Sequence, residues 1–440
     1  MSILSAFASC LPPFLLTAGL YFLVCLSGFS LFRPRALRGL FRGSDTASRR
    51  ALFLSLAGTL GVGNIAGVGV ALSIGGEGAI FWLFIGGVVA TVLKYAEITL
   101  SIDYRERGKK SRGALDYIRP TLGRGAATLF GVLTLALSLL MGSLLQGSVI
   151  RAAADGLWSI RPLSLALCLL ALTALLFLGG RRAVEGLTGI LIPTLTVLYC
   201  LLAIGIISKN LASLPGIVTR ILRGAFSLRS AGGGLLGTGL ARAMRAGIGK
   251  GLFSNEAGAG TAPFAHGDAS VHPAREGLYG VLEVVIDTLF MCTLTALAVL
   301  SCFDALPALS GTALVSAAFT AVYGRAAGGM VALSVILFSY ATVACWVSYG
   351  QTALTHLSDA PTFRLFYALL FCLALLLGVY LGEGRAFLLC DAVLAAMTFI
   401  NTTALLKNTA RIRRLTDEYL LLQKTKKPNN EKYAVPQVHQ

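Results

Sequence analysis

Two glycine-rich stretches in this 440-residue sequence also carry asparagine, and they are the segments best suited to bind a ligand. The first runs from Gly58 to Gly67 (GTLGVGNIAG) and the second from Gly247 to Gly260 (GIGKGLFSNEAGAG). Glycine allows a helix to unwind, and unwinding frees backbone N–H and C=O groups. Freed carbonyl oxygens can coordinate a small cation, and the amino end of a half-helix can receive a carboxylate. The chemistry predicted from these stretches is therefore non-covalent binding of a cation and a small anionic or zwitterionic solute.

The composition places both stretches in a membrane protein. Hydrophobic residues make up 56% of the chain and charged residues only 13%, whereas soluble domains carry about 25% charged residues. This excludes a disordered protein, a disulfide scaffold and an ordinary cytosolic enzyme, and it predicts a polytopic membrane protein. The nine cysteines and four histidines show no metal-ligand spacing, so no metal centre of that kind is expected.

Ten apolar runs are long enough to cross a bilayer. They cover residues 12–32, 51–75, 79–102, 126–150, 162–179, 186–208, 278–301, 329–353, 363–382 and 386–406. An eleventh segment, 240–267, is less apolar and contains the second glycine-rich stretch. With eleven spans and the amino terminus outside, 25 of the 37 lysines and arginines fall on the inner side. The positive-inside rule therefore predicts an outer amino terminus and a cytoplasmic carboxyl terminus.

The two glycine-rich stretches open two blocks of five spans, residues 51–208 and 240–406. Five is an odd number, so the blocks take opposite orientations, as in transporters built from inverted repeats with broken helices. The remaining parts are an extra amino-terminal helix with a basic inner loop (1–50), an outer connecting segment (209–239) and a basic cytoplasmic tail (407–440). The predicted fold class is an all-α polytopic membrane protein of about eleven transmembrane helices. The alternative interpretation of the glycines is close helix packing, but buried Asn and Glu need partners and favour a site.

At these residues the sequence resembles the alanine/glycine:cation symporter family. The matching segments include GTLGVGNIAGV, GGEGAIFWLF and RAGIGKGLFSNEAGAGTAPFAH, and FSNEAG is the most specific of them. The resemblance runs in order from about residue 13 to residue 406. It implies a five-plus-five inverted repeat of the leucine-transporter type, preceded by one extra helix. It also implies uptake of small neutral amino acids, chiefly alanine and glycine, coupled to sodium or protons, in the plasma membrane (the inner membrane of a prokaryote).

The resemblance assigns substrate contacts to both glycine-rich stretches. Gly63 and Asn64 would contact the substrate, with backbone N–H groups near Gly63 facing its carboxylate. Phe253, Ser254 and Asn255 would close the pocket from the other side. The alternative role for Asn64 is to cap the second half-helix, and both roles are compatible.

Two further residues complete the expected substrate site. Gln146 lies in an apolar span, where its amide can accept from an ammonium and donate to a carboxylate; an interhelical hydrogen bond is the alternative. Trp346 would form a wall or lid that limits the pocket to small side chains, with an interfacial position as the alternative.

The expected coupling-ion site follows from the fold analogy. Sodium candidates are the carbonyls of Ala57 and Leu60 and the hydroxyl of Thr342. Related sequences usually carry Ser at the position of Ala341, so one hydroxyl is missing here. This departure leaves sodium and proton coupling open as alternatives, with Glu256 or Asp287 titrating in the second case.

The other charged residues within spans are expected to be structural. Lys94 and Glu97 are three residues apart on a helix and are expected to form an ion pair. Glu256 is expected to cap a half-helix or to bind Lys250. Asp287 is expected to be a supporting carboxylate rather than a proton carrier.

The sequence thus predicts a secondary active symporter working by alternating access and needing no cofactor beyond its coupling ion. The expected partners are a small neutral amino acid, sodium and the lipid bilayer, without nucleic acid or an obligate protein partner. An intramembrane enzyme is disfavoured because neither HExxH nor GxSxG is present. A channel is disfavoured because the expected site is the size of a single amino acid.

Overall fold

The chain is all-helical wherever its structure is described. A computed structural model describes residues 3–26, 40, 46–106, 109–155, 160–226, 238–358 and 360–425. Within these ranges every regular element is a helix and no strand is present. The predicted all-α class is therefore confirmed.

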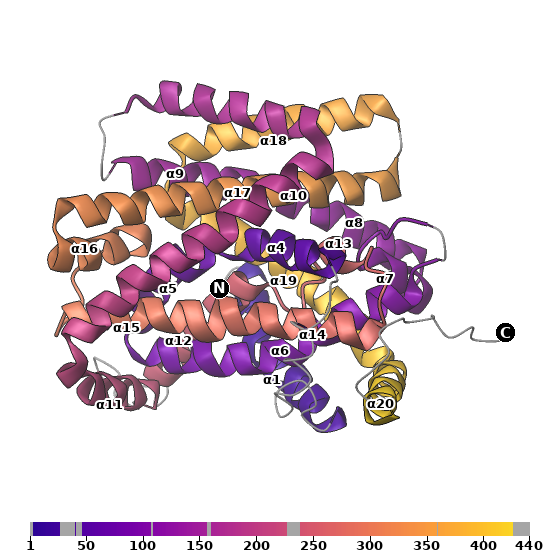
Figure 1. Ribbon diagram of the computed structural model, residues 1–440, viewed down its shortest axis with the longest axis horizontal. Coiled ribbons are helices and arrows are strands. Elements are labelled where there is room, and N and C mark those ends of the chain that lie inside the picture. The colour runs from indigo at the N-terminus through magenta and orange to yellow at the C-terminus, as the bar shows by residue number, and fades with distance from the viewer. Residues whose placement is uncertain are drawn as a thin grey trace.

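Figure 1 shows the helices packed into one bundle, coloured in chain order. The first part of the chain contains α1 (Ile3–Cys25), α4 (Thr46–Thr59), η1 (Val62–Gly67), α5 (Val68–Gly75), α6 (Gly78–Tyr104), α7 (Leu115–Leu122), α8 (Arg124–Leu139), η2 (Leu140–Leu144), α9 (Leu145–Asp155) and α10 (Pro162–Lys209). The second part contains η3 (Leu211–Ser213), α11 (Leu214–Ala225), α12 (Thr238–Asn255), α13 (Pro263–His266), α14 (Pro273–Val284), η4 (Val285–Cys292), α15 (Thr293–Cys302), α16 (Gly311–Tyr323), α17 (Arg325–Leu357), α18 (Pro361–Tyr380), α19 (Glu383–Lys407) and α20 (Thr409–Thr425).

Eight of the described helices are long and apolar enough to cross a membrane. They are Gly78–Tyr104, Arg124–Asp155, Pro162–Gly180, Arg182–Lys209, Pro273–Cys302, Gly328–Leu357, Pro361–Tyr380 and Glu383–Lys407. The bent pair Thr46–Thr59 and Val62–Gly75 makes a ninth span if its two halves cross together. The other two expected spans correspond to α1, whose apolar part is short, and to α12, the segment of weak hydropathy.

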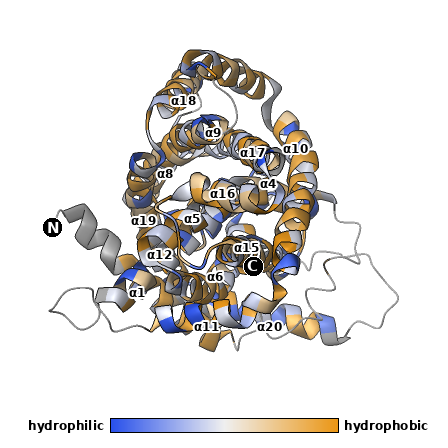
Figure 2. Cartoon of the chain, turned by 90° about the vertical axis from the view of Figure 1, so that its left-hand side faces the viewer, coloured by the Kyte–Doolittle hydropathy of each residue, from blue (hydrophilic) through white to orange (hydrophobic). Residues whose placement is uncertain are grey.

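Two helices at the edge of the bundle, α10 and α18, expose many large apolar side chains. Figure 2 shows hydrophobic residues along α10 and α18 at the periphery of the bundle. Large apolar side chains on these two helices are exposed, including Leu163, Leu175, Leu178, Ile190, Leu201, Leu365, Leu369 and Leu377. Such a surface is unfavourable in water and suits hydrocarbon.

The first glycine-rich stretch breaks its helix, as predicted. The two halves, α4 and η1 with α5, meet at an angle of 44°. Gly61 has φ 122° and ψ −84° at the break, a backbone conformation that side chains with a β-carbon rarely adopt. The chain continues through η1, a short π-helix, and π-helical turns are frequent at functional sites.

The second glycine-rich stretch also breaks its helix. α12 ends at Asn255, and the short α13 begins only at Pro263. Between them the backbone takes positive φ values at Glu256 (53°), Gly258 (86°) and Gly260 (78°). A non-glycine residue with positive φ is uncommon, so Glu256 marks a backbone conformation that the surrounding packing imposes.

The helices that carry the breaks pack on two long partners. α6 runs along both α12 and α14, while α17 contacts α4, α8, α9 and α10. At the end of the described chain, α20 packs against α14 and α6, where Tyr95 and Thr416 share a hydrogen bond of 2.8 Å between their hydroxyl oxygens. The breaks therefore lie inside the bundle, surrounded by other helices rather than by lipid.

Candidate functional site

The two broken segments touch each other. A β-carbon placed on Gly63 would lie 2.5 Å from Cα of Ser254 and 2.8 Å from its Cβ. Such distances are far below ordinary van der Waals contact, so the backbone of η1 rests directly on the last turn of α12. The structure therefore brings together Gly63 and Ser254, which the sequence predicted to face each other across one site.

Asn64 both caps the first break and links it to η4. Its Oδ1 accepts a hydrogen bond from the backbone N–H of Gly61 at 3.0 Å. Its Nδ2 donates to the backbone oxygen of Asp287 at 2.6 Å and to Oδ1 of the same residue at 2.8 Å. The capping role expected of Asn64 is thus present, and the amide also reaches the neighbouring helix.

Asp287 connects the two breaks. One carboxylate oxygen accepts from Asn64, while the other accepts from the hydroxyls of Ser254 at 2.9 Å and Thr288 at 2.7 Å. The side chain is fully buried. A buried carboxylate needs several donors, and here the donors come from both broken segments. This geometry agrees with the supporting role expected of Asp287.

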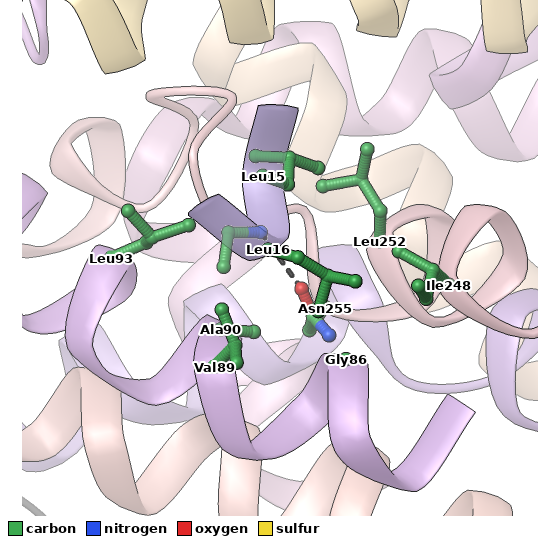
Figure 3. A pocket seen from close by; sticks show the side chains of 10 residues that line it. Leu15, Leu16, Gly86, Val89, Ala90, Leu93, Ile248, Leu252 and Asn255 are labelled. Carbon is green, nitrogen blue, oxygen red and sulfur yellow. Dashed lines mark hydrogen bonds between the residues drawn. The ribbon is translucent and has the colours of Figure 1, made fainter. Parts of the chain in front are cut away.

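Phe253 and Asn255 hold the carboxyl end of α12. The ring of Phe253 packs edge-on against Phe387, with centroids 4.9 Å apart. The amide of Asn255 donates to the Thr288 hydroxyl at 3.1 Å and accepts from the backbone N–H of Ala257 at 2.9 Å. The same Asn255 side chain borders an apolar pocket beside α1 (Figure 3).

Gln146 and Trp346 each keep one polar atom unpartnered. Gln146 donates to the backbone oxygen of Met141 at 2.8 Å, while its Oε1 is buried without a hydrogen-bond partner in the described part of the chain. The indole N–H of Trp346 is buried and unpartnered in the same sense. Because Trp346 is 0% exposed, the interfacial alternative for it is wrong. Unpartnered buried donors and acceptors are costly, and a polar ligand would satisfy them.

The tryptophan is fixed against the fourth predicted span. A β-carbon on Gly142 would lie 2.2 Å from Cβ of Trp346, so η2 and α17 approach at backbone distance. Tyr349 packs edge-on to the indole, with ring centroids 5.5 Å apart. Because η2 and α17 are in close contact here, the indole can shift relative to η2 only if the two helices separate.

The expected sodium ligands lie where α4 ends against α17. The hydroxyl of Thr342 donates to the backbone oxygen of Ala57 at 2.8 Å, and it also approaches the backbone oxygen of Phe338 at 3.1 Å. Leu60 is fully buried on the same turn. Carbonyl and hydroxyl oxygens are the donors that hard cations prefer. The structure thus places Ala57 and Thr342 in contact through a hydrogen bond between their oxygens.

Two pockets border the helices that carry the breaks. The pocket of Figure 3 is lined by apolar side chains of α1, α6 and α12, among them Leu15, Val89 and Leu252. The other lies beside the start of α4, with Arg50, Glu185 and Asp268 in its lining. The broken segments themselves are closed on each other at Gly63 and Ser254, so an amino acid could lie at this contact only after they separate.

The ion pair expected between Lys94 and Glu97 is wrong. Lys94 pairs with Glu283 of α14, Nζ to Oε1 at 2.7 Å. Glu97 instead accepts from the backbone N–H of Gly258 in the second break. The reason is that α6 is packed between α12 and α14, so each side chain finds a partner on the facing element rather than on its own helix.

The partner expected for Glu256 is also wrong. Lys250 binds Asp391 of α19, Nζ to Oδ2 at 2.8 Å. Both carboxylate oxygens of Glu256 are buried and have no hydrogen-bond partner in the described residues. The expected cap is therefore absent too, because the positive φ of Glu256 belongs to the turn that ends α12 rather than to the start of a half-helix.

A ladder of polar contacts between α4 and α14 was missed in the sequence. Ser48 donates to Glu276 at 2.6 Å, and Ser55 donates to Glu283 at 2.8 Å. The two serines and the two glutamates are both spaced by seven residues, which is two helical turns. This matched spacing was the available signal, because it places both pairs along one seam between parallel helices.

An all-helical bundle with two broken helices meeting at a buried polar site defines a class of membrane transporter. The fold is similar to that of a solved mutant form of the manganese transporter of Eremococcus coleocola. The two are 14% identical, the match covers 86% of this chain and 78% of that chain, and the TM-score is 0.51. The predicted fold class, an all-α membrane protein of the leucine-transporter type, is thus confirmed.

The chain belongs to the sodium:alanine symporter family, whose model matches residues 3–434. It is 31% identical to the sodium/alanine symporter AgcS of Methanococcus maripaludis, over 82% of each chain. It is 30% identical to the amino-acid carrier protein AlsT of Bacillus subtilis, over 83% of this chain and 78% of that protein. An uncharacterized transporter of Haemophilus influenzae is 32% identical over 88% of both chains. This membership makes the protein a multi-pass amino-acid transporter and not an enzyme.

Proposed function

We propose that this protein imports small neutral amino acids, alanine and glycine first among them, together with sodium by alternating access. The observation that carries the proposal is the direct contact of the two broken segments at Gly63 and Ser254. Because glycine brings no side chain to this contact, the two segments close tightly, and they must separate before a solute can lie between them. The names of the relatives AgcS and AlsT support an amino acid as that solute.

Sodium is proposed to bind where α4 ends. The ion takes the backbone oxygens of Ala57 and Leu60 and the hydroxyl of Thr342, which now donates to Ala57. These carbonyls belong to the negative end of the half-helix, where a cation is favourable. Because α17 supplies the hydroxyl, the bound ion holds the first break against α17 and favours the conformation that accepts the amino acid.

The amino acid is proposed to bind between the breaks, with its carboxylate at the backbone N–H groups near Gly63. Asn64, Phe253, Ser254 and Asn255 border this space. Gln146 and Trp346 each bring a buried polar atom that lacks a partner among the described residues. The indole of Trp346 limits the length of the substrate side chain. The bundle that carries both broken helices rocks against the remaining helices around this site. The amino terminus lies outside and the carboxyl terminus in the cytoplasm of a cell whose plasma membrane holds the protein.

The direct test is uptake of labelled alanine into proteoliposomes that contain the purified protein. A sodium gradient, inside low, without a pH gradient should drive accumulation above the equilibrium level. Asn64→Ala and Asn255→Ala should each abolish uptake while the protein still inserts and purifies. Lack of any response to sodium would refute sodium coupling, and transport at the wild-type rate by both variants would refute the site between the breaks.

Proton coupling is the second candidate, and one observation favours it. Glu256 is buried beside the second break, and neither of its carboxylate oxygens accepts a hydrogen bond from the described residues. A proton would neutralise this buried group. A Bacillus subtilis relative, YrbD, is named a putative sodium/proton-dependent alanine carrier protein. An imposed pH gradient in sodium-free buffer separates the two, because it drives uptake only under proton coupling. Glu256→Gln should then abolish the proton-driven component.

A further inference from the structure

Lys94 places a fully buried ammonium against the end of the second broken helix. Its Nζ donates to the backbone oxygen of Asn255 at 2.6 Å and lies 2.7 Å from Oε1 of Glu283. The side chain is 0% exposed, within the α6 span. Charged residues at such depth are costly and are retained for a function or for a partner. Here the partner is a backbone carbonyl as well as a carboxylate.

The carbonyl of Asn255 is a helix end of the same kind as the proposed sodium ligands. Asn255 is the last residue of α12, so its oxygen belongs to the negative end of that half-helix. At the first break the corresponding group is the backbone oxygen of Ala57, which contacts only the neutral hydroxyl of Thr342 among the bonds described above. One half-helix thus ends on a neutral hydroxyl, while the other ends on the amine head group of a lysine that is paired with a carboxylate.

We propose that the ammonium of Lys94 is a tethered cation, which fills at the second break the kind of site that a free coupling ion fills at the first. The proposal rests on the proposed function, because it takes the free ion to bind at Ala57. Its ligands are the Asn255 carbonyl and the Glu283 carboxylate. The second oxygen of Glu283 accepts from Ser55 of α4 at 2.8 Å, so the tethered charge also connects the second break to the helix that leads into the first.

The surrounding carboxyl groups favour a cation at this place. Three buried carboxyl groups, those of Glu97, Glu256 and Glu283, interact electrostatically with the one ammonium of Lys94. Asp287 of η4 also interacts with it, from the seam between the breaks. Uncompensated charge in a low-dielectric interior either attracts a counter-ion or takes up protons. Removal of the lysine would therefore leave a vacancy that a small cation can enter.

The consequence for transport is the number of mobile ions. With Lys94 in place, the second break needs no ion from solution, and sodium acts at the first break alone. A lysine head group also cannot leave its site, so the carboxyl end of α12 moves together with α6 and α14 during the cycle. Lys94 is in this sense a positioning residue that also limits the number of coupled cations.

The first test is Lys94→Ala, which removes three methylene groups and the ammonium. Uptake of alanine should fall by about 100-fold, because breaking a buried pair leaves its partners uncompensated. Ethylammonium is small enough for the vacancy and should restore at least about a tenth of the lost rate of alanine uptake. It should also raise the melting temperature of the variant in detergent, because a cation that binds the folded state stabilises that state. The control is Lys209→Met, at the exposed end of α10. Its alanine uptake should equal that of the wild type, and ethylammonium should change neither its uptake nor its melting temperature.

The dependence of uptake on sodium concentration is a second measurement. If Lys94 and Glu283 formed only a structural ion pair, loss of Lys94 would not change the steepness of this dependence. The rate of uptake by the wild type should rise with sodium concentration with a Hill coefficient near 1. In Lys94→Ala, a second sodium ion should enter the vacancy. The residual uptake rate should then rise more steeply with sodium concentration, with a Hill coefficient of about 2. Failure of ethylammonium to change either rate or melting temperature, together with an unchanged Hill coefficient, would overturn the proposal.

A double variant covers the case in which Lys94→Ala does not fold. Lys94→Met with Glu283→Gln replaces both charges by neutral groups of similar size, which proteins often tolerate. If Lys94 acts as a tethered cation, this double variant should fold but take up alanine at least about 100-fold more slowly than the wild type, because the Asn255 carbonyl has lost its ion. Uptake at the wild-type rate would show a replaceable structural pair and overturn the proposal. Lack of sodium-driven uptake by the wild type itself would instead refute the proposed function.

Discussion

Gly63→Ala offers the most direct test of the contact between the breaks. The added methyl group would lie 2.5 Å from Cα of Ser254, 2.8 Å from its Cβ and 2.9 Å from its Oγ. The nearest of these is backbone, so no side-chain rotation relieves the clash, and the two segments must separate by roughly 1 Å to reach ordinary contact. Overpacking of a closed core costs typically 1–3 kcal/mol. The closed conformation should therefore lose about 5–150-fold in population relative to the open ones.

The assay compares alanine uptake and thermal stability of the variant with those of Gly67→Ala. Gly67 lies on the same π-helical segment with φ −60° and ψ −40°, and a β-carbon there would meet only the backbone oxygen of Val62 at 3.6 Å. Gly67→Ala should transport normally and gain about 0.4–1 kcal/mol of stability. Gly63→Ala should lose most of its uptake and melt at a lower temperature.

The result that would refute this reasoning is equal behaviour of the two alanine variants. If Gly63→Ala transports at the wild-type rate, the segments are not in backbone contact during the cycle, and the closed site described above is not an intermediate of transport. If Gly67→Ala fails as completely as Gly63→Ala, the effect comes from the loss of glycine in η1 and not from the contact with Ser254.

Three further substitutions probe the other parts of the site. Thr342→Val removes one hydroxyl without a change of shape and should raise the sodium concentration for half-maximal uptake about five- to tenfold, as a sodium titration of alanine uptake would measure. Asp287→Asn exchanges an acceptor of three hydrogen bonds for a group that accepts fewer. The free energy of unfolding should fall by about 1–3 kcal/mol, which a lower melting temperature in detergent would show. An unchanged melting temperature would contradict the bridge between the breaks. Trp346→Ala should let methionine compete with alanine uptake, and lack of competition would show that the indole does not limit substrate size.

The parts of the fold predicted from the sequence were those set by local chemistry. Apolar length located the spans, and the glycines of the two stretches located both breaks, because only glycine takes the backbone conformation seen at Gly61 without strain. The capping role of Asn64 followed from its position at the start of a half-helix. These inferences need only a short window of sequence.

The partners of the buried charges could not be predicted in the same way. Helical spacing suggested Glu97 for Lys94, but the ammonium meets Asn255, 161 residues later, and Glu283. Lys250 likewise meets Asp391, 141 residues later. Such pairs depend on which helices pack together, and a single sequence carries that information only weakly. The seven-residue spacing shared by the serines of α4 and the glutamates of α14 can be seen in the sequence, but it identifies partners only once the parallel packing of these helices is known.

The long separation of these polar pairs has a consequence for biosynthesis. Asn64 and its partner Asp287 are 223 residues apart, and at 5–20 residues per second the ribosome needs about 10–45 s to span that interval. Throughout this time the break in the first helix has already been made, and its amide has no acceptor from η4. Lipid cannot satisfy such a group. The insertion machinery must therefore shelter the amino-terminal helices until η4 arrives. A variant that delays this assembly will lose protein to membrane proteases before it loses any step of transport.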